Sequence, residues 1–271
     1  MVTGAEGQSL DARDPMSALA ITVAYDGSLF AGFARQPGLR TVQGALESAL
    51  ETVFGASLPT VGAGRTDAGV HALGQVVSVD VPGDELDLAR LRRSLGALTG
   101  PGVVVRGVAL ARPGFSARFD AVEREYRYRI TPGPVAPLFL ERFSWHVPAA
   151  LDVGAMREAA AVLVGEHDFA SFCVTESAIG KNTVRAVREI EIVVEEHLGE
   201  ECVTVRVVGN AFLHSMIRVM VGTLVEVGVG RRDAAWVAEA LAARTRSAAG
   251  PTAPAHGLVF HAVRYPADVW R

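Results

Sequence analysis

An aspartate stands between glycines in the segment GAGRTDAGVHALGQV, residues 62–76. Gly64 and Gly69 flank Asp67, and glycines allow unusual backbone dihedrals and the close approach of another chain. Arg65 stands close enough for a local ion pair, and an opposite charge keeps a carboxylate ionised. An ionised carboxylate held in a loop can act as a nucleophile or a general base. The same residues are also typical of a turn held by an arginine–aspartate pair, so this segment alone leaves a catalytic and a structural interpretation open.

The glycines do not follow the pattern of a phosphate-binding loop. A Walker A loop ends in GK[ST], and the dinucleotide fingerprint is followed by a helix. Here the strand-like segment QVVSVDV follows, and Asp67 would repel a phosphate at close range. The segment therefore disfavours nucleotide binding.

Arginines and aromatic residues interleave in RPGFSARFDAVEREYRYRI, residues 112–130. On a strand, Tyr126 and Tyr128 face one side while Arg127 and Arg129 face the other. Rings that stack on bases, beside arginines that meet phosphates, suit a single-stranded or flipped nucleotide. An aromatic core face with a solvated arginine face is the structural alternative, because three acidic residues in the segment partly neutralise it.

Three further cations are candidates for contacts. Arg35 lies in the glycine-rich connection before the first expected helix, where donors suit backbone phosphates. His214 and Arg218 lie four apart in the apolar segment 212–228, which predicts a buried helix with both on one face. A charge in so apolar a helix needs a partner, which would be a core acid, Asp67 or a substrate phosphate.

Metal and cofactor motifs are not found in the sequence. The seven histidines are scattered without an HExxH pair, and no GxSxG elbow is present. Cys173 and Cys202 form no CxxC pattern, which disfavours both a disulfide framework and a zinc site. We therefore predict no cofactor, no metal and no serine or cysteine nucleophile, and expect a reducing cytoplasm.

The composition is that of a globular protein. With 271 residues, two domains or one large domain are expected. The net charge of -4 argues at first against nucleic acid, but net charge describes the whole surface and not one cleft. All but one of the 26 basic residues are arginine, which suits bidentate phosphate contacts, although an arginine-rich codon bias gives the same skew.

The first residues of the sequence differ in character from the rest of the chain. Residues 1–17 are polar and without period, so we expect a disordered leader. They have no apolar h-region, which argues against a secretory signal. No run approaches the roughly 20 apolar residues of a membrane span, so no membrane association is expected.

Alternating strands and helices must position these residues. Strands are predicted at 18–27, 75–81, 102–111, 124–132, 187–196, 202–212 and 257–266, and helices at 41–55, 87–100, 152–165, 212–228 and 233–243. This alternation predicts an α+β protein of two related halves. The half at 18–113 carries the Asp67 segment and the half at 114–271 carries the Tyr126 strand, with the seam near 112–120.

The motifs, in their order, resemble the tRNA pseudouridine synthase A family from about Ala20 to Pro266. AGRTDAGVHALGQV resembles its catalytic loop, and YDGSLFAGFARQ with TVQGALESAL its first strand, loop and helix. FSARFDAVEREYRYRI resembles its stacking-tyrosine strand, and LVGEHDFASF, NAFLHSMIRVMVGTLVEVG and HGLVFHAVRYP its C-terminal half. The resemblance implies a pseudouridine synthase fold: two halves of mainly antiparallel sheet flanked by helices, with the active-site cleft between them.

The resemblance also implies an activity. The family isomerises uridines at positions 38, 39 and 40 in the anticodon stem-loop of tRNA, as a homodimer and without cofactor or metal. By resemblance, Asp67 is the essential carboxylate, Tyr126 stacks on the flipped base, Arg65 pairs with Asp67, and Leu258 walls the pocket. The further candidates for RNA contacts are Arg35, Arg118, His214 and Arg218.

Pseudouridine forms when the N1–C1′ bond breaks and the base rejoins through C5, so neither a redox equivalent nor ATP is needed. The sequence leaves open whether the carboxylate attacks C1′, adds to C6 or removes the 2′ proton. Ala34 and Asn182 depart from the family's usual residues, which bears on the tRNA footprint. The rival hypotheses are a non-catalytic RNA-binding protein on the same fold, and a hydrolase, which would want a second carboxylate.

Overall fold

The computed structural model describes residues 16–271. These residues form two compact units. The first comprises the described residues up to Val122 together with Val263–Arg271, and the second comprises Glu123–Ala262. Most of the predicted leader, residues 1–15, lies outside the described residues, but Met16 and Ser17 belong to the first strand and correct the leader's predicted end.

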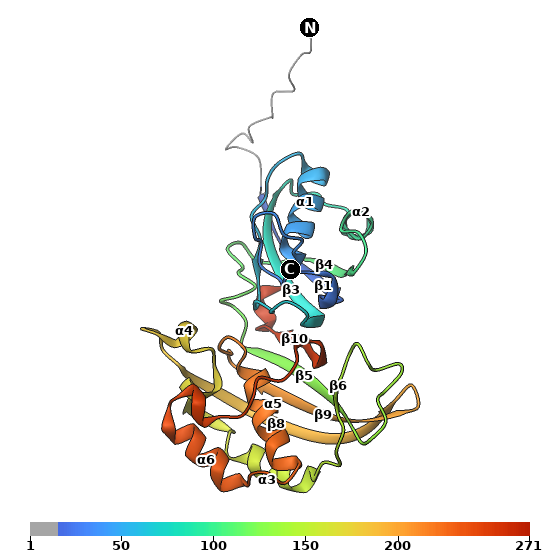
Figure 1. Cartoon of the computed structure of the whole chain (residues 1–271). Coiled ribbons are helices and arrows are strands. Elements are labelled where there is room, and N and C mark those ends of the chain that lie inside the picture. The colour runs from blue at the N-terminus through green and yellow to red at the C-terminus, as the bar shows by residue number, and fades with distance from the viewer. Residues whose placement is uncertain (1–15) are drawn as a thin grey trace. The chain divides into compact units, whose positions relative to one another are not determined.

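The first unit is a small antiparallel sheet covered by helices. Its strands are β1 (Met16–Tyr25), β2 (Val61–Gly62), β3 (His71–Pro82) and β4 (Val103–Leu110), its helices are α1 (Val42–Phe54) and α2 (Leu88–Leu98), and short 3-10 helices span Gly27–Leu29 and Ala267–Val269. Strand β1 pairs antiparallel with both β3 and β4, and β2 pairs antiparallel with β3. Figure 1 shows α1 and α2 beside this sheet.

The residue pattern explains both ends of α1 and the buried face of α2. The Thr41 hydroxyl accepts the Gly44 N–H at the start of α1, and Gly55 ends the helix in the left-handed region with a φ of 70°. Leu91 and Leu95 of α2 are buried, as their spacing predicts. Leu98, the last residue of the helix, is exposed although it continues the same spacing of leucines.

The second unit is a larger sheet with helices. Its strands are β5 (Glu123–Pro132), β6 (Trp145–Val147), β7 (Gly165–Asp168), β8 (Val184–His197), β9 (Glu200–Gly209) and β10 (Leu258–Arg264), and its helices are α3 (Val153–Ala161), α4 (Thr175–Ala178), α5 (Met216–Gly228) and α6 (Ala234–Ala243). Short 3-10 helices span Ala170–Phe172, Arg246–Ala248 and Ala255–Gly257. The strand order is β10-β5-β9-β8-β7, with β6 parallel to β5.

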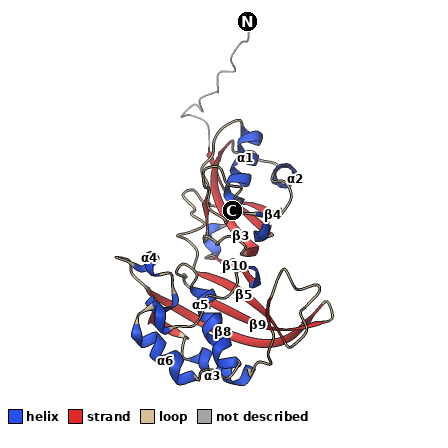
Figure 2. Ribbon diagram, in the orientation of Figure 1, coloured by secondary structure: helices blue, strands red, loops and turns tan. Residues whose placement is uncertain are grey.

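Helices α3, α5 and α6 contact one another, and α3 also contacts β8. Figure 2 shows the three helices together beside this sheet. Nearly every residue of α5 is buried, as its continuous apolar sequence predicts. No helix within residues 16–271 is both long enough and apolar enough to cross a membrane.

The C-terminal residues return to the first unit, which the predicted division after residue 113 did not include. The ring centroid of Phe115 lies 5.2 Å from that of Tyr265 and 5.9 Å from that of Trp270. The Arg112 N–H also donates to the Val269 carbonyl at 2.9 Å. These contacts join segments far apart in the sequence, so no local sequence pattern predicts them.

Candidate active site

The loop that carries Asp67, residues 63–70, lies between β2 and β3. It is anchored at Thr66, through both the side chain and the main chain of this residue. The hydroxyls of Tyr25 and Thr66 are 2.8 Å apart and buried. The Phe33 N–H donates to the Thr66 carbonyl at 3.1 Å. Since both the side chain and the main chain of its neighbour are held, the backbone of the half-buried Asp67 has a defined position.

The second half of this loop is held by Gly27. The Gly69 N–H donates to the Gly27 carbonyl at 3.3 Å, and the Gly27 N–H donates to Nδ1 of His71 at 3.1 Å. The Val70 N–H closes a turn on the Asp67 carbonyl at 3.1 Å. Gly69 has a φ of 80°, a left-handed conformation that favours glycine. Gly27 was not among the predicted site residues, and the only local signal for it is the Asp26-Gly27 pair that follows β1.

The strand after the loop, predicted at 75–81, is β3 and is largely buried. Gln75, Val77 and Val79 are almost fully buried in β3. The Gln75 amide donates to the Gly64 carbonyl at 2.7 Å and so ties the wall to the loop. Arg65 is exposed on the loop, and its pairing with Asp67 stays a prediction.

Strand β5 alternates as predicted, with Tyr126 and Tyr128 on one face and Arg127 and Arg129 on the other, whereas Arg124 is buried on the tyrosine face. Tyr126 is buried, and its ring meets the rings of Phe212 and Phe260 edge-on at 5.3 Å and 4.7 Å between centroids. Leu258 is also buried and lies two residues before Phe260, so the two share one face of β10.

Tyr128 belongs to the core and not to a base-stacking surface. Its side chain is fully buried, and its hydroxyl donates to the Pro254 carbonyl at 2.8 Å. Burial raises the pKa of this hydroxyl, which stays protonated. A Cβ added at Gly257 would lie 2.6 Å from the ring, so the fit is close. The structural alternative is therefore correct for this tyrosine.

The arginine face of β5 is engaged in ion pairs within the sheet. Arg127 lies 2.8 Å from Glu125, and Arg206 bridges Glu125 at 3.2 Å and Glu189 at 2.8 Å. Burial alone would raise the pKa of Glu125, but the hydrogen bond from Arg127 and the charges of Arg206 and Arg127 lower it overall. The structural alternative thus accounts for this face as well.

The remaining cations lie in different surroundings. Arg35 is mostly exposed and pairs with Glu47 of α1 at 3.0 Å. Arg118 is exposed, and its guanidinium lies 5.5 Å from the ring centroid of Phe119, a ring that is 80% exposed. An exposed aromatic ring beside an arginine is the pairing that suits an unstacked base.

The prediction that His214 and Arg218 lie on one face of a buried helix was wrong for His214. Helix α5 begins at Met216, after Ser215 in the left-handed region with a φ of 58°, so His214 lies outside the helix and is exposed. Arg218 is inside the helix and half-buried. Its Nε donates to the Ala253 carbonyl at 2.7 Å, and the Ala253 N–H donates back to the Arg218 carbonyl at 3.0 Å.

Comparisons with known proteins agree with the motifs. A sequence profile of the family described as "tRNA pseudouridine synthase" matches residues 21–120 and 159–266. The chain is 47% identical to tRNA pseudouridine synthase A of Frankia casuarinae, over 94% of this chain and 92% of the relative. It is 45% identical to the protein of that name from Brevibacillus brevis, over 92% of this chain and the whole of the relative. It is 42% identical to the one from Shouchella clausii, over 92% and 94% of the two chains.

Proposed function

The chain belongs to the tRNA pseudouridine synthase family, and we propose that it forms pseudouridine at positions 38, 39 and 40 of the anticodon stem-loop with Asp67 as its essential carboxylate. It is an isomerase that converts uridine to pseudouridine in tRNA, and it has the α+β pseudouridine synthase fold. The observation that carries the assignment of Asp67 is its loop, in which Thr66 is anchored through both side chain and main chain.

The chemistry asks for one carboxylate, a way to hold the extruded base, and protection from water. Asp67 acts on the nucleoside while the N1–C1′ bond breaks and C5 takes its place at C1′. Tyr126 stacks on the flipped base, and Arg65 pairs with Asp67 and helps to hold the nucleotide. Leu258 walls the pocket. Unstacking the base costs a few kcal/mol, which stacking on the tyrosine offsets.

Water must not capture the sugar while the base is detached. The buried apolar residues of β3 support this requirement, because they leave little polar surface behind the Asp67 loop. A hydrolase would instead admit water and would release free uracil. This difference in products separates the two kinds of enzyme.

The resemblance to the family also supports a proposal for the wider assembly. We propose a homodimer in the cytoplasm, with each tRNA crossing both subunits. Phosphate contacts dominate the affinity of such complexes and make it depend on salt. The residues proposed to contact RNA are Arg35, Arg118, His214 and Arg218, of which the first three are exposed and Arg218 is half-buried.

The direct test is to incubate unmodified tRNA with the protein and to map pseudouridine along the product. Conversion confined to positions 38, 39 and 40 is the expected result. Free uracil and an abasic site would point to hydrolysis. Binding without any conversion would show that the protein is a non-catalytic RNA-binding protein on this fold.

Tyr126→Phe is expected to keep tRNA affinity close to that of the wild type, because the ring that stacks on the base stays. Tyr126→Leu removes the π face and should weaken the interaction by about 1–3 kcal/mol, the usual contribution of a stacked base. Affinity and kcat/KM measured on the same tRNA check both expectations. Loss of activity in the phenylalanine variant with affinity retained would assign a chemical role to the hydroxyl.

Tyr128→Phe is the matched control, since it lies on the same face of the same strand but in the core. It removes the hydrogen bond to the Pro254 carbonyl and should lower stability by about 1 kcal/mol. Its kcat/KM should stay near the wild-type value. Equal losses of activity in Tyr126→Leu and Tyr128→Phe would contradict a specific stacking role for Tyr126.

A further inference from the structure

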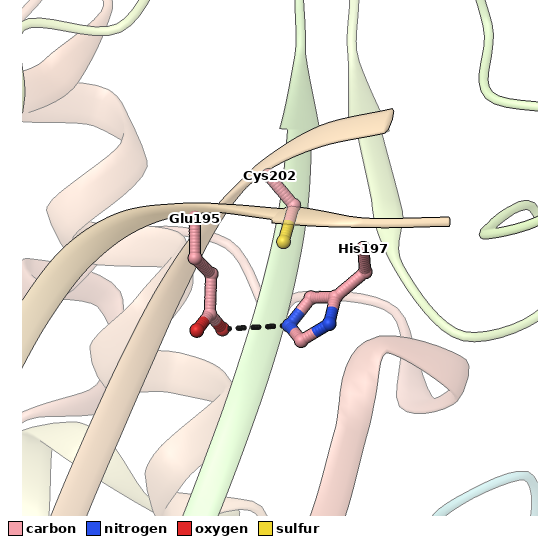
Figure 3. A group of neighbouring side chains, drawn as sticks. All are labelled: Glu195, His197 and Cys202. Carbon is pink, nitrogen blue, oxygen red and sulfur yellow. Dashed lines mark ion pairs between the residues drawn. The ribbon is translucent and has the colours of Figure 1, made fainter. Parts of the chain in front are cut away.

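Three side chains of different metal-binding chemistry meet near the end of the β8–β9 hairpin, and we propose that they form a zinc site. They are Glu195, His197 and Cys202, and their donor atoms all lie within 4.8 Å of one another. Figure 3 shows the three side chains directed to the same side of the hairpin. The proposal concerns the second unit alone and does not depend on the proposed function.

The hairpin register brings the three donors together. Glu195 and His197 are two apart on β8 and therefore share a face. Cys202 lies directly across from Glu195 on β9, so its side chain points to that same face. Leu198 and Gly199 form the two-residue turn with φ values of 54° and 80°, as a type I′ turn requires. Such a tight turn leaves the register little freedom, so the donors are preorganised.

A carboxylate oxygen, an imidazole nitrogen and a thiolate sulfur are a donor set typical of zinc. The Glu195 Oε1 and His197 Nε2 atoms are 2.9 Å apart. Ligands about 2.0–2.3 Å from a tetrahedral zinc stand roughly 3–4 Å from one another. Small side-chain rotations would therefore bring these donors into place, with water as the fourth ligand.

His197 already meets another proposed ligand in the structure. Its Nε2 atom is enclosed and lies 2.9 Å from Oε1 of Glu195, which is its ion-pair partner. A metal ion bound by both groups would replace this ion pair and would use the lone pair of this nitrogen.

Some neighbouring side chains would orient the zinc ligands, and others would favour or disfavour a bound zinc ion through their charge. The Thr204 hydroxyl donates to Glu195 and lies 3.9 Å from the Cys202 sulfur, which suits an outer-shell residue. Burial raises the pKa of the Cys202 thiol, so binding would displace a proton. The positive charge of Arg129 would disfavour a zinc ion at this site, whereas the negative charge of Glu201 would favour one.

Bound zinc would stabilise the β8–β9 hairpin, and with it the connection between β5 and β6 that Glu200 holds. The Glu200 carboxylate accepts the N–H groups of Leu138, Phe139 and Leu140 from the connection between β5 and β6. Glu200 lies across from His197 in the hairpin register. A metal that fixes His197 would thus also fix the anchor of this loop.

The sequence alone did not indicate these ligands, because the histidines form no HExxH pair and the cysteines form no CxxC pattern. Here the ligands are joined across a hairpin, in the pattern E-x-H-x4-C of EEHLGEEC. The signal that could have found them is the turn itself, since Leu198 and Gly199 define which residues face each other.

The test uses the full-length untagged protein, reduced and stripped of metal with a chelator. Zn²⁺ is titrated against a chromophoric chelator, and Co²⁺ is added separately as a spectroscopic probe. We expect one equivalent of each metal to bind, with a thiolate-to-cobalt charge-transfer band and the intense visible bands of tetrahedral cobalt. A folded wild-type protein that binds no stoichiometric zinc and shows no such band would overturn the proposal.

Cys202→Ser is expected to abolish the charge-transfer band and to weaken zinc binding at least tenfold. Cys173→Ser, which replaces the other cysteine of the chain, is the matched control and should keep both. If Cys202→Ser does not fold, His197→Gln serves instead, since its partly exposed side chain tolerates the change. A band that survives in Cys202→Ser, or disappears in Cys173→Ser, would contradict the assigned ligand.

Discussion

Asp67→Asn is expected to abolish pseudouridine formation while tRNA affinity stays close to the wild-type value. The amide has the shape of the carboxylate but can serve neither as a nucleophile nor as a base. Removal of such a group costs about 10²–10⁴-fold in rate when it acts in proton transfer, and more when it forms a covalent bond. Affinity should survive because it depends on many phosphate contacts spread over the tRNA.

Single-turnover conversion and equilibrium binding, measured with the same unmodified tRNA, check this expectation. Asp80→Asn is the matched control, because Asp80 is an exposed carboxylate on β3 of the same unit. It should keep both activity and affinity. Measurable turnover of Asp67→Asn at a rate near the wild type would remove Asp67 from the mechanism, and a joint loss of activity and binding would give it a structural role.

Gly27→Ala is expected to reduce activity strongly by displacing the Asp67 loop. A Cβ at this position would lie 2.0 Å from the carbonyl oxygen of Val70 and 2.9 Å from the carbonyl carbon of Gly69. These are backbone atoms, so no side-chain rotation relieves the overlap and the loop itself must move. Overpacking of this kind costs about 1–3 kcal/mol of stability. A displacement of about 1 Å at a reacting group can cost about 10² in rate.

Rates under saturating tRNA, together with chemical unfolding curves, separate the two effects. The expected pattern is a folded protein with kcat lowered by about two orders of magnitude and with tRNA affinity largely retained. Gly107→Ala is the control, because a Cβ at that position on β4 meets no atom within 4 Å. A Gly27→Ala variant with full kcat would show that the loop does not depend on this contact.

Local structure was predictable wherever neighbouring residues decide it. Helix α1 has its cap at Thr41 and its stop at Gly55, at the two ends of the range 41–55 predicted for it, since capping involves residues within one turn. The β8–β9 hairpin turns at Leu198 and Gly199, between the strands predicted at 187–196 and 202–212. The predicted start of α5 at residue 212 was wrong. The helix begins only after Ser215, which has a left-handed backbone conformation that is unusual for a residue other than glycine.

The functional assignment also came from the sequence, through the Arg65-Thr66-Asp67 motif and the order of the other segments. What the sequence could not assign was the contribution of each residue to packing. Tyr126 and Tyr128 have the same residue type and the same face of β5. Tyr128 is nevertheless a core residue, because the Pro254 carbonyl and Gly257, more than a hundred positions away, enclose it.

By itself the sequence thus determined the family, the candidate carboxylate and the positions of the longer helices and strands, because these depend on residue types and on neighbours along the chain. It did not predict the short elements β2, β6, β7 and α4. Only the tertiary structure decided which residues hold the Asp67 loop. Tyr25, Gly27 and Phe33 contact it through a hydroxyl and backbone groups, and nearly every residue carries the same backbone groups. The same reason applies to Glu195, His197 and Cys202, since the pairing of two strands places their side chains on one face.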